Sequence, residues 1–151
     1  MNPFKKILCA VDLSDNLPDA AEYAAMLARS LGAEVEILYV APTLSQYVGF
    51  HVPPSSIENF VGEIVEGAER GMAAFVAEHF EGVKAAGKVV TGYAAEEILH
   101  YAAAINADLI VIGTHGRKGL DRLLFGSVAQ KVAKTAAQPV LTIKPKGEGN
   151  V

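Results

Sequence analysis

The chain has 151 residues, of which 51% are hydrophobic and 20% are charged, and its formal net charge is -4. This length fits a single domain over 1–151 with a substantial core. We expect no nucleic-acid partner, because an acidic chain offers little positive charge to neutralise phosphates. We also expect no membrane partner and no secretory leader, since no apolar run is long enough. The single cysteine, Cys9, lies in an apolar run, so it is predicted to be a buried thiol in a cytoplasmic protein.

Strand and helix patterns alternate along the first half of the chain. Unalternating apolar runs predict strands covered on both faces, and apolar residues at steps of three and four predict helices. N-cap candidates over 12–16 precede the first helix, which Gly32 is expected to end. The predicted order is a strand at 7–11, a helix to Gly32, a strand at 34–40, a loop over 41–56 and a long amphipathic helix over 57–79.

The second half continues the alternation. The predicted elements are a weaker strand over 84–91, a helix over 94–105, a strong strand over 108–112, a helix over 127–136, a strand over 140–143 and a flexible tail over 145–151. Five strands separated by four helices predict an α/β domain with one open parallel sheet and helices on both faces. Each strand–helix–strand unit is expected to form a right-handed crossover.

A glycine-containing loop follows the strong strand at 108–112. The strand stops at Gly113, and Gly126-Ser127 is interpreted as the start of the next helix. A strand, a loop and a helix N-terminus together place backbone N–H groups around an anion. Gly126 has no Cβ, so a phosphate can approach closely, and the N–H groups of Ser127 and Val128 are expected to be first-turn donors.

Asp12 follows the first strand, as Gly113 follows the fourth. Ligands of open parallel sheets bind beyond the carboxyl ends of the strands, where the strand order reverses. If the two strands are neighbours, Asp12 and the glycine loop face one crevice. A carboxylate repels phosphate, so Asp12 suits a ribose hydroxyl or an adenine amino group.

The spacing Gly113-x2-Gly116-x9-Gly126-Ser127, together with Val11-Asp12-x-Ser14, resembles the ATP-binding members of the universal stress protein family. The resemblance implies a Rossmann-like sheet of order 3-2-1-4-5 and a homodimer paired through the last strand, 140–143. It implies ATP, ADP or AMP as the cofactor, with Mg as a further option. Adenine would lie near Asp12 and the backbone of Val40, and the phosphates over Gly116, Gly126 and Ser127. The site residues so implied are Ala10, Asp12, Val40, Gly113, Gly116, Arg117, Gly126, Ser127 and Val128.

The chain departs from the family pattern at two positions. Ala129 stands where many nucleotide-binding relatives have a hydroxyl residue, which removes one expected phosphate contact. Tyr93 stands where an Asp, Asn or Pro is more usual before the third helix, and this change is expected to concern only the turn.

Simpler interpretations of single residues stay open. Each glycine of the loop can serve as an ordinary turn residue, and charged loop residues are usually just solvated. For His115 we favour a conformational role. Asp121 can act as a capping or ion-binding acid, and Arg117, Lys118 and Arg122 can act as phosphate partners. The phosphate-loop, dinucleotide and nucleophile-elbow motifs are missing from the sequence.

The sequence therefore predicts a dimeric adenine-nucleotide sensor or regulator in a stress response, with no catalytic residue and no metal ligand assigned. Two other functions stay open. One is a slow ATPase or phosphotransferase. The other is a partner-binding dimer with a vestigial nucleotide pocket.

Overall fold

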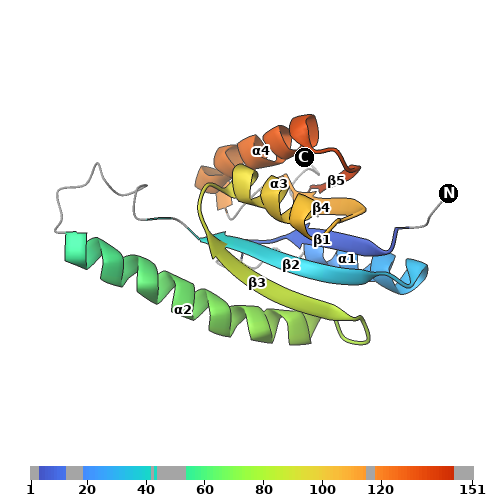
Figure 1. Ribbon diagram of the computed structural model, residues 1–151, viewed down its shortest axis with the longest axis horizontal. Coiled ribbons are helices and arrows are strands. Elements are labelled where there is room, and N and C mark those ends of the chain that lie inside the picture. The colour runs from blue at the N-terminus through green and yellow to red at the C-terminus, as the bar shows by residue number, and fades with distance from the viewer. Residues whose placement is uncertain (1–3, 13–18, 42, 44–53, 115–117, 145–151) are drawn as a thin grey trace.

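The computed structural model describes residues 4–12, 19–41, 43, 54–114 and 118–144, with the backbone alone described at 19, 54–58 and 118–125. Nine elements follow one another along the chain (Figure 1). They are β1 (Lys6–Ala10), α1 (Asp19–Leu31), β2 (Glu34–Ala41), α2 (Pro54–His79), β3 (Ala85–Thr91), α3 (Ala94–Ala104), β4 (Leu109–Gly113), α4 (Lys118–Thr135) and β5 (Val140–Ile143). The predicted alternation of strands and helices is confirmed.

The strands form one parallel sheet of order β3-β2-β1-β4-β5, as the resemblance implied. Successive strands run outward from β1 to β3, and the chain then crosses to β4 on the other side of β1. The strand order therefore reverses between β1 and β4, which pair through Ala10 and Ile112 at their carboxyl ends. This pair of strands is where an open parallel sheet binds its ligands.

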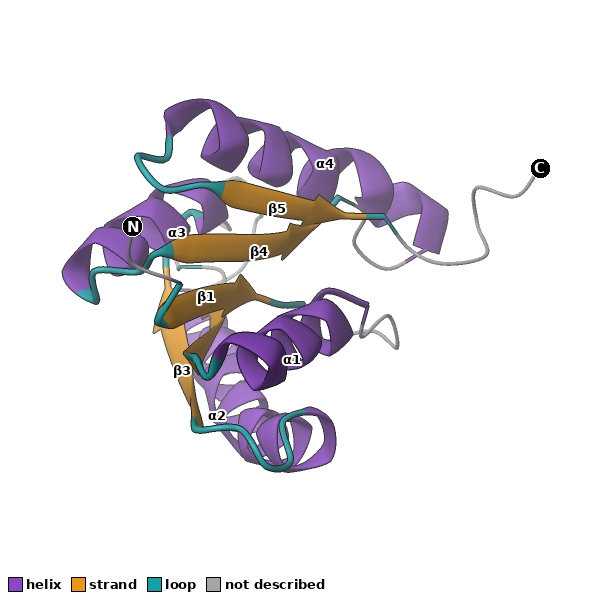
Figure 2. Ribbon diagram, turned by 90° about the vertical axis from the view of Figure 1, so that its right-hand side faces the viewer, coloured by secondary structure: helices purple, strands orange, loops and turns teal. Residues whose placement is uncertain are grey.

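Alternate residues of the central strands enter two separate cores, because successive side chains of a strand point to opposite faces. Ile7 and Cys9 pack with α1 and α2 on one face of the sheet. Leu8 and Ala10 pack with α3 and α4 on the other face (Figure 2). Both faces of the central strands are thus covered, which explains their continuous apolar sequence.

Cys9 is fully buried in the first of these cores. Burial raises the pKa of its thiol to about 12, because the apolar surroundings disfavour the thiolate. The prediction of a buried thiol is confirmed. In the described part of the chain, no helix has both the length and the apolar character needed to cross a membrane.

The boundaries of most elements lie within one or two residues of the prediction, and two helices begin earlier. α2 begins at Pro54, three residues before the predicted start, because proline is well accommodated in a first helical turn. α4 begins at Lys118, nine residues before the predicted start at Ser127. That prediction was wrong because the intervening residues are mostly good helix formers, and one internal glycine costs only about 1 kcal/mol.

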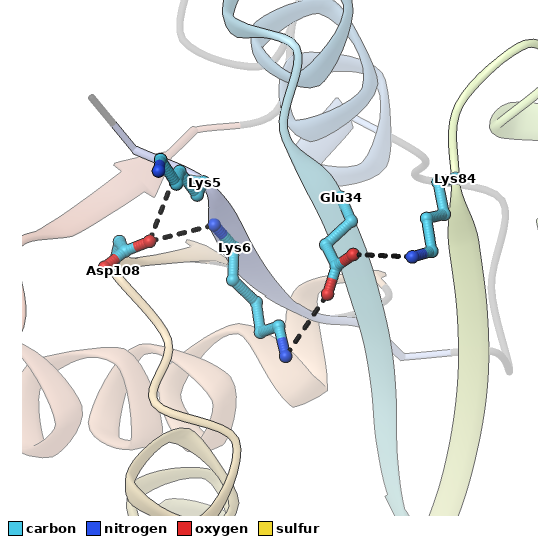
Figure 3. Close-up of polar contacts among 5 residues, drawn as sticks. All are labelled: Lys5, Lys6, Glu34, Lys84 and Asp108. Atoms are coloured by element: carbon cyan, nitrogen blue, oxygen red, sulfur yellow. Dashed lines mark hydrogen bonds and ion pairs between the residues drawn. The ribbon is translucent and has the colours of Figure 1, made fainter. Parts of the chain in front are cut away.

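The amino edge of the sheet is held together by charged groups (Figure 3). Asp108 accepts hydrogen bonds from the backbone N–H groups of Lys5 and Lys6, both at 2.9 Å, and these bonds lower its pKa. Glu34 lies between the ammonium groups of Lys84 and Lys6, each 3.2 Å away, and hydrogen bonds from both lower its pKa. These contacts join the starts of β1, β2, β3 and β4, at the edge opposite the candidate site.

Candidate nucleotide site at the carboxyl edge of the sheet

The candidate site lies where β1 and β4 end. Ala10 pairs with Ile112 in the parallel ladder, so Asp12 and Thr114 each lie two residues beyond this pair. The N–H of Val11 donates to the carbonyl of Leu38 at 3.0 Å, which extends the β1–β2 ladder toward Asp12. The first and fourth strands are therefore neighbours, as the resemblance implied, and the backbone of Asp12 follows the end of β1 beside the end of β4.

Val40 is brought to the same edge by β2. It pairs with Val90 of β3, and the next residue, Ala41, accepts a hydrogen bond of 3.0 Å from the N–H of Gly92. Val40 is partly buried against the core beneath α3 and α4. Its backbone therefore lies at the carboxyl edge, on the far side of β1 from β4.

Gly126 brings α4 close to the end of β4. A Cβ built on Gly126 would lie 3.3 Å from the carbonyl oxygen of Thr114, which is tighter than an ordinary van der Waals contact. Glycine therefore lets the helix approach the strand at this point. Gly126 thus lies close to Thr114, the residue that follows Gly113, and the next residue of α4, Ser127, is exposed.

The backbone amides of Ser127 and Val128 occupy a different position from the one predicted. Both residues lie inside α4, which begins at Lys118. Amides in a helix interior bond to carbonyl groups four residues earlier, so they are not free first-turn donors. The positive end of the helix dipole lies near Lys118 instead. In this structure, Gly126 and Ser127 present the flank of a helix to the site rather than its N-terminus.

The remaining predicted site residues fall into two groups. Ala10 is 3% exposed and its side chain is part of the core, and Val128 packs partly against the same core. Because both side chains pack in the core, Ala10 and Val128 can contact a ligand only through backbone atoms or through the part of the side chain that is not covered. The second group lies outside the described residues or has no described side chain: Gly116 and Arg117, with His115, Lys118, Asp121 and Arg122.

Thr114 is a residue of this site that the sequence reasoning did not single out. Its N–H donates to the carbonyl of Ile143 at 2.8 Å, and its hydroxyl donates to the same oxygen at 3.3 Å. Thr114 thus connects the end of β4 to the end of β5. The only signal in the sequence was a hydroxyl residue directly after the glycine that ends a strand.

The two positions at which the chain departs from the family pattern differ in their surroundings. Ala129 is 3% exposed and packs in the core beneath α3 and α4, so a hydroxyl there would face apolar side chains. The expectation that Ala129 removes a phosphate contact is therefore not supported by its position. Tyr93 is the N-cap of α3, makes no side-chain cap hydrogen bond and is 56% exposed.

Comparison with known proteins identifies the family. Residues 3–144 match the family model for the universal stress protein family. The universal stress protein MJ0531 of Methanocaldococcus jannaschii is 39% identical over 97% of this chain and 86% of its own length. The universal stress protein YxiE of Bacillus subtilis is 34% identical over 93% of this chain and 99% of its own length.

Solved structures share the fold. The structure of MJ0577, also from Methanocaldococcus jannaschii, has a TM-score of 0.78 at 28% identity and covers 96% of this chain and 99% of its own. A universal stress protein from Archaeoglobus fulgidus, solved in complex with dAMP, has a TM-score of 0.67 at 24% identity and covers 95% and 100%. The chain belongs to the universal stress protein family.

Proposed function

We propose that this protein binds an adenine nucleotide at the carboxyl edge of its sheet and works as a dimeric sensor or regulator in the cytoplasm. One observation carries the proposal. The strand order reverses between β1 and β4; Asp12 follows β1 at this place, and Gly126 of α4 lies close to Thr114, which follows β4. This is the place where open parallel sheets bind ligands, and it combines a carboxylate with a backbone that a ligand can approach closely.

The chemistry of the residues suggests how a nucleotide would be held. The Asp12 carboxylate accepts hydrogen bonds from ribose hydroxyls or the adenine amino group. The exposed hydroxyl of Ser127 and the bare Cα of Gly126 suit a phosphate. The Archaeoglobus fulgidus relative with the same fold was solved with dAMP, so adenine nucleotides are the first ligands to test on this chain.

The primary experiment is a calorimetric titration of the nucleotide-stripped protein with ATP and magnesium. We expect saturable binding of about one ATP per chain. Gly126→Val should abolish it, because the added side chain would meet the carbonyl of Thr114 and displace Gly126 and Ser127 from the place proposed for the phosphate. The matched control is Gly71→Val, which adds the same side chain to a helical glycine with no atom within 4 Å.

The position of Gly126 calls for a check of folding in the same series, because its Cβ would press on Thr114 and shift α4 by a few tenths of an ångström. Circular dichroism melting of both variants provides this check. A folded Gly126→Val protein with unchanged ATP affinity would disprove the site, and a wild-type protein that binds no adenine nucleotide would disprove the function. Steady phosphate release that disappears with Gly126→Val would indicate a slow ATPase or phosphotransferase instead.

Asp12→Ala tests which part of the nucleotide the carboxylate recognises. Loss of a charged hydrogen-bond acceptor should lower the affinities for adenosine and for ATP by similar factors, about tenfold or more. Asp108→Ala is the control, since it removes a carboxylate from the opposite edge of the sheet. A loss confined to ATP would place Asp12 at the phosphates and contradict the proposed orientation.

The two edges of the sheet support the dimer in this proposal. Lys88 of β3 is exposed, and a charged side chain discourages pairing with another strand. β5 has no charged residue, and Val140 and Leu141 are half-buried. An uncharged edge strand is the better template for a second copy of the chain.

A further inference from the structure

We propose that Thr114 is a positioning residue for the nucleotide site, because it sets the distance between β4 and Gly126 of α4. The inference rests on the proposed function, since the site that Thr114 positions is the proposed nucleotide site. Thr114 is the residue at which three elements meet: it follows β4, it is bonded to the end of β5, and its carbonyl oxygen faces α4.

The first contact of Thr114 fixes its orientation. Its N–H and its hydroxyl both donate to the carbonyl oxygen of Ile143, at 2.8 Å and 3.3 Å. The N–H bond continues the β4–β5 ladder, in which Gly113 pairs with Ile143. The hydroxyl bond holds the side chain against the same carbonyl. Ile143 itself is 7% exposed and belongs to the core, so Thr114 is hydrogen-bonded to a residue whose position is fixed by packing.

The second observation concerns the carbonyl group of Thr114, which lies beside Gly126 of the candidate site. The carbonyl oxygen of Thr114 lies 3.3 Å from the position that a Cβ on Gly126 would occupy. This spacing leaves room for the bare Cα of Gly126 and would be tight for a residue with a side chain. The space that accommodates Gly126 and the adjacent Ser127, where phosphate is expected, therefore depends on where the carbonyl group of Thr114 points, and the backbone and side-chain bonds to Ile143 restrict the position of this residue.

Comparison of Thr114→Val with Thr114→Ser tests the inference. Valine keeps the shape of threonine and removes its hydroxyl, whereas serine keeps the hydroxyl. With Thr114→Val we expect the dissociation constant for ATP to rise about fivefold, the factor for one net hydrogen bond. Thr114→Ser should stay within about twofold of wild type. Thr135→Val, an exposed threonine at the end of α4, is the matched control.

Adenosine distinguishes a positioning role from a general loss of stability. If Thr114 acts through Gly126, Thr114→Val weakens the binding of ATP and leaves the dissociation constant for adenosine within about twofold of wild type, because adenosine has no phosphate. An equal loss of affinity for both ligands, or unchanged ATP affinity in a folded Thr114→Val protein, would overturn the inference. A wild-type protein that binds neither ligand would overturn the proposed function, and the inference with it.

Discussion

Glycines in this chain have different roles that only their surroundings reveal. Gly62, Gly67 and Gly71 of α2 face open space, since a Cβ added to any of them would meet no atom within 4 Å. Gly87 of β3 is the opposite case. A Cβ there would overlap Cγ of Met72 and lie 2.7 Å from its Sδ. Gly87 therefore allows α2 to pack closely on β3.

We predict opposite effects on stability from two glycine-to-alanine substitutions. Gly87→Ala should lower the free energy of unfolding by about 1–3 kcal/mol, because Met72 must leave its place in the core. Gly71→Ala should raise it by about 0.5–1 kcal/mol, because alanine favours the helix and nothing obstructs its methyl group. Urea denaturation of both variants measures the difference. A Gly87→Ala protein as stable as wild type would show that Met72 repacks without cost.

At the scale of an element, α4 decides what the candidate site can offer. A helix beginning at Ser127 would present two free amides to a phosphate, as the sequence predicted. The structure begins the helix at Lys118, so those amides belong to the helix interior. The site then depends on the flank of α4 at Gly126, which is partly buried, and Ser127, which is exposed.

Amide hydrogen exchange tests this assignment in the nucleotide-free protein. We expect the amides of Ser127 and Val128 to be protected, at levels similar to that of Val132 later in the same helix, because each is bonded within α4. Rapid exchange at Ser127 and Val128, with Val132 still protected, would contradict a helix that starts at Lys118. Such a result would support the sequence-based prediction that the amides of Ser127 and Val128 are first-turn donors.

At the scale of the whole molecule, the two edges of the sheet differ in what they allow. β3 lies at one edge with exposed Ala86 and Lys88, and β5 lies at the other with an uncharged surface (Figure 1). A second copy is therefore expected to pair along β5. The β5 edge also contains Ile143, to which Thr114 of the candidate site is bonded.

We predict that Leu141→Lys yields monomers where the wild-type chain forms the proposed dimer, because the new charge would be buried between two β5 strands. Leu141 also packs on the core, so Thr142→Lys, at an exposed position of β5, separates loss of pairing from loss of stability. Ala86→Lys places the same charge on the other edge and should leave the dimer intact. Light scattering measures the three masses. A dimer that persists in both β5 variants would show that the interface lies elsewhere.

Local sequence determines much of this protein, because the pattern of apolar residues reports which faces are covered. The runs that became β1 and β4 predicted central strands, and the alternation of elements predicted a parallel sheet. The order 3-2-1-4-5 came from the family resemblance, since spacing alone does not say which strands are neighbours. Asp12 and Gly126 were likewise candidates before the fold was known.

Long-range packing decides the rest, because it depends on atoms far apart in the chain. Nothing near Gly126 indicates that its Cα faces the carbonyl of Thr114, or that Thr114 is bonded to Ile143, 29 residues away. The start of α4 was mispredicted for a related reason: a Gly-Ser pair is a good helix start in isolation, but a helix already formed passes through it at small cost. Residue types and periods are local properties, whereas contacts between β4, β5 and α4 exist only once the sheet has brought them together.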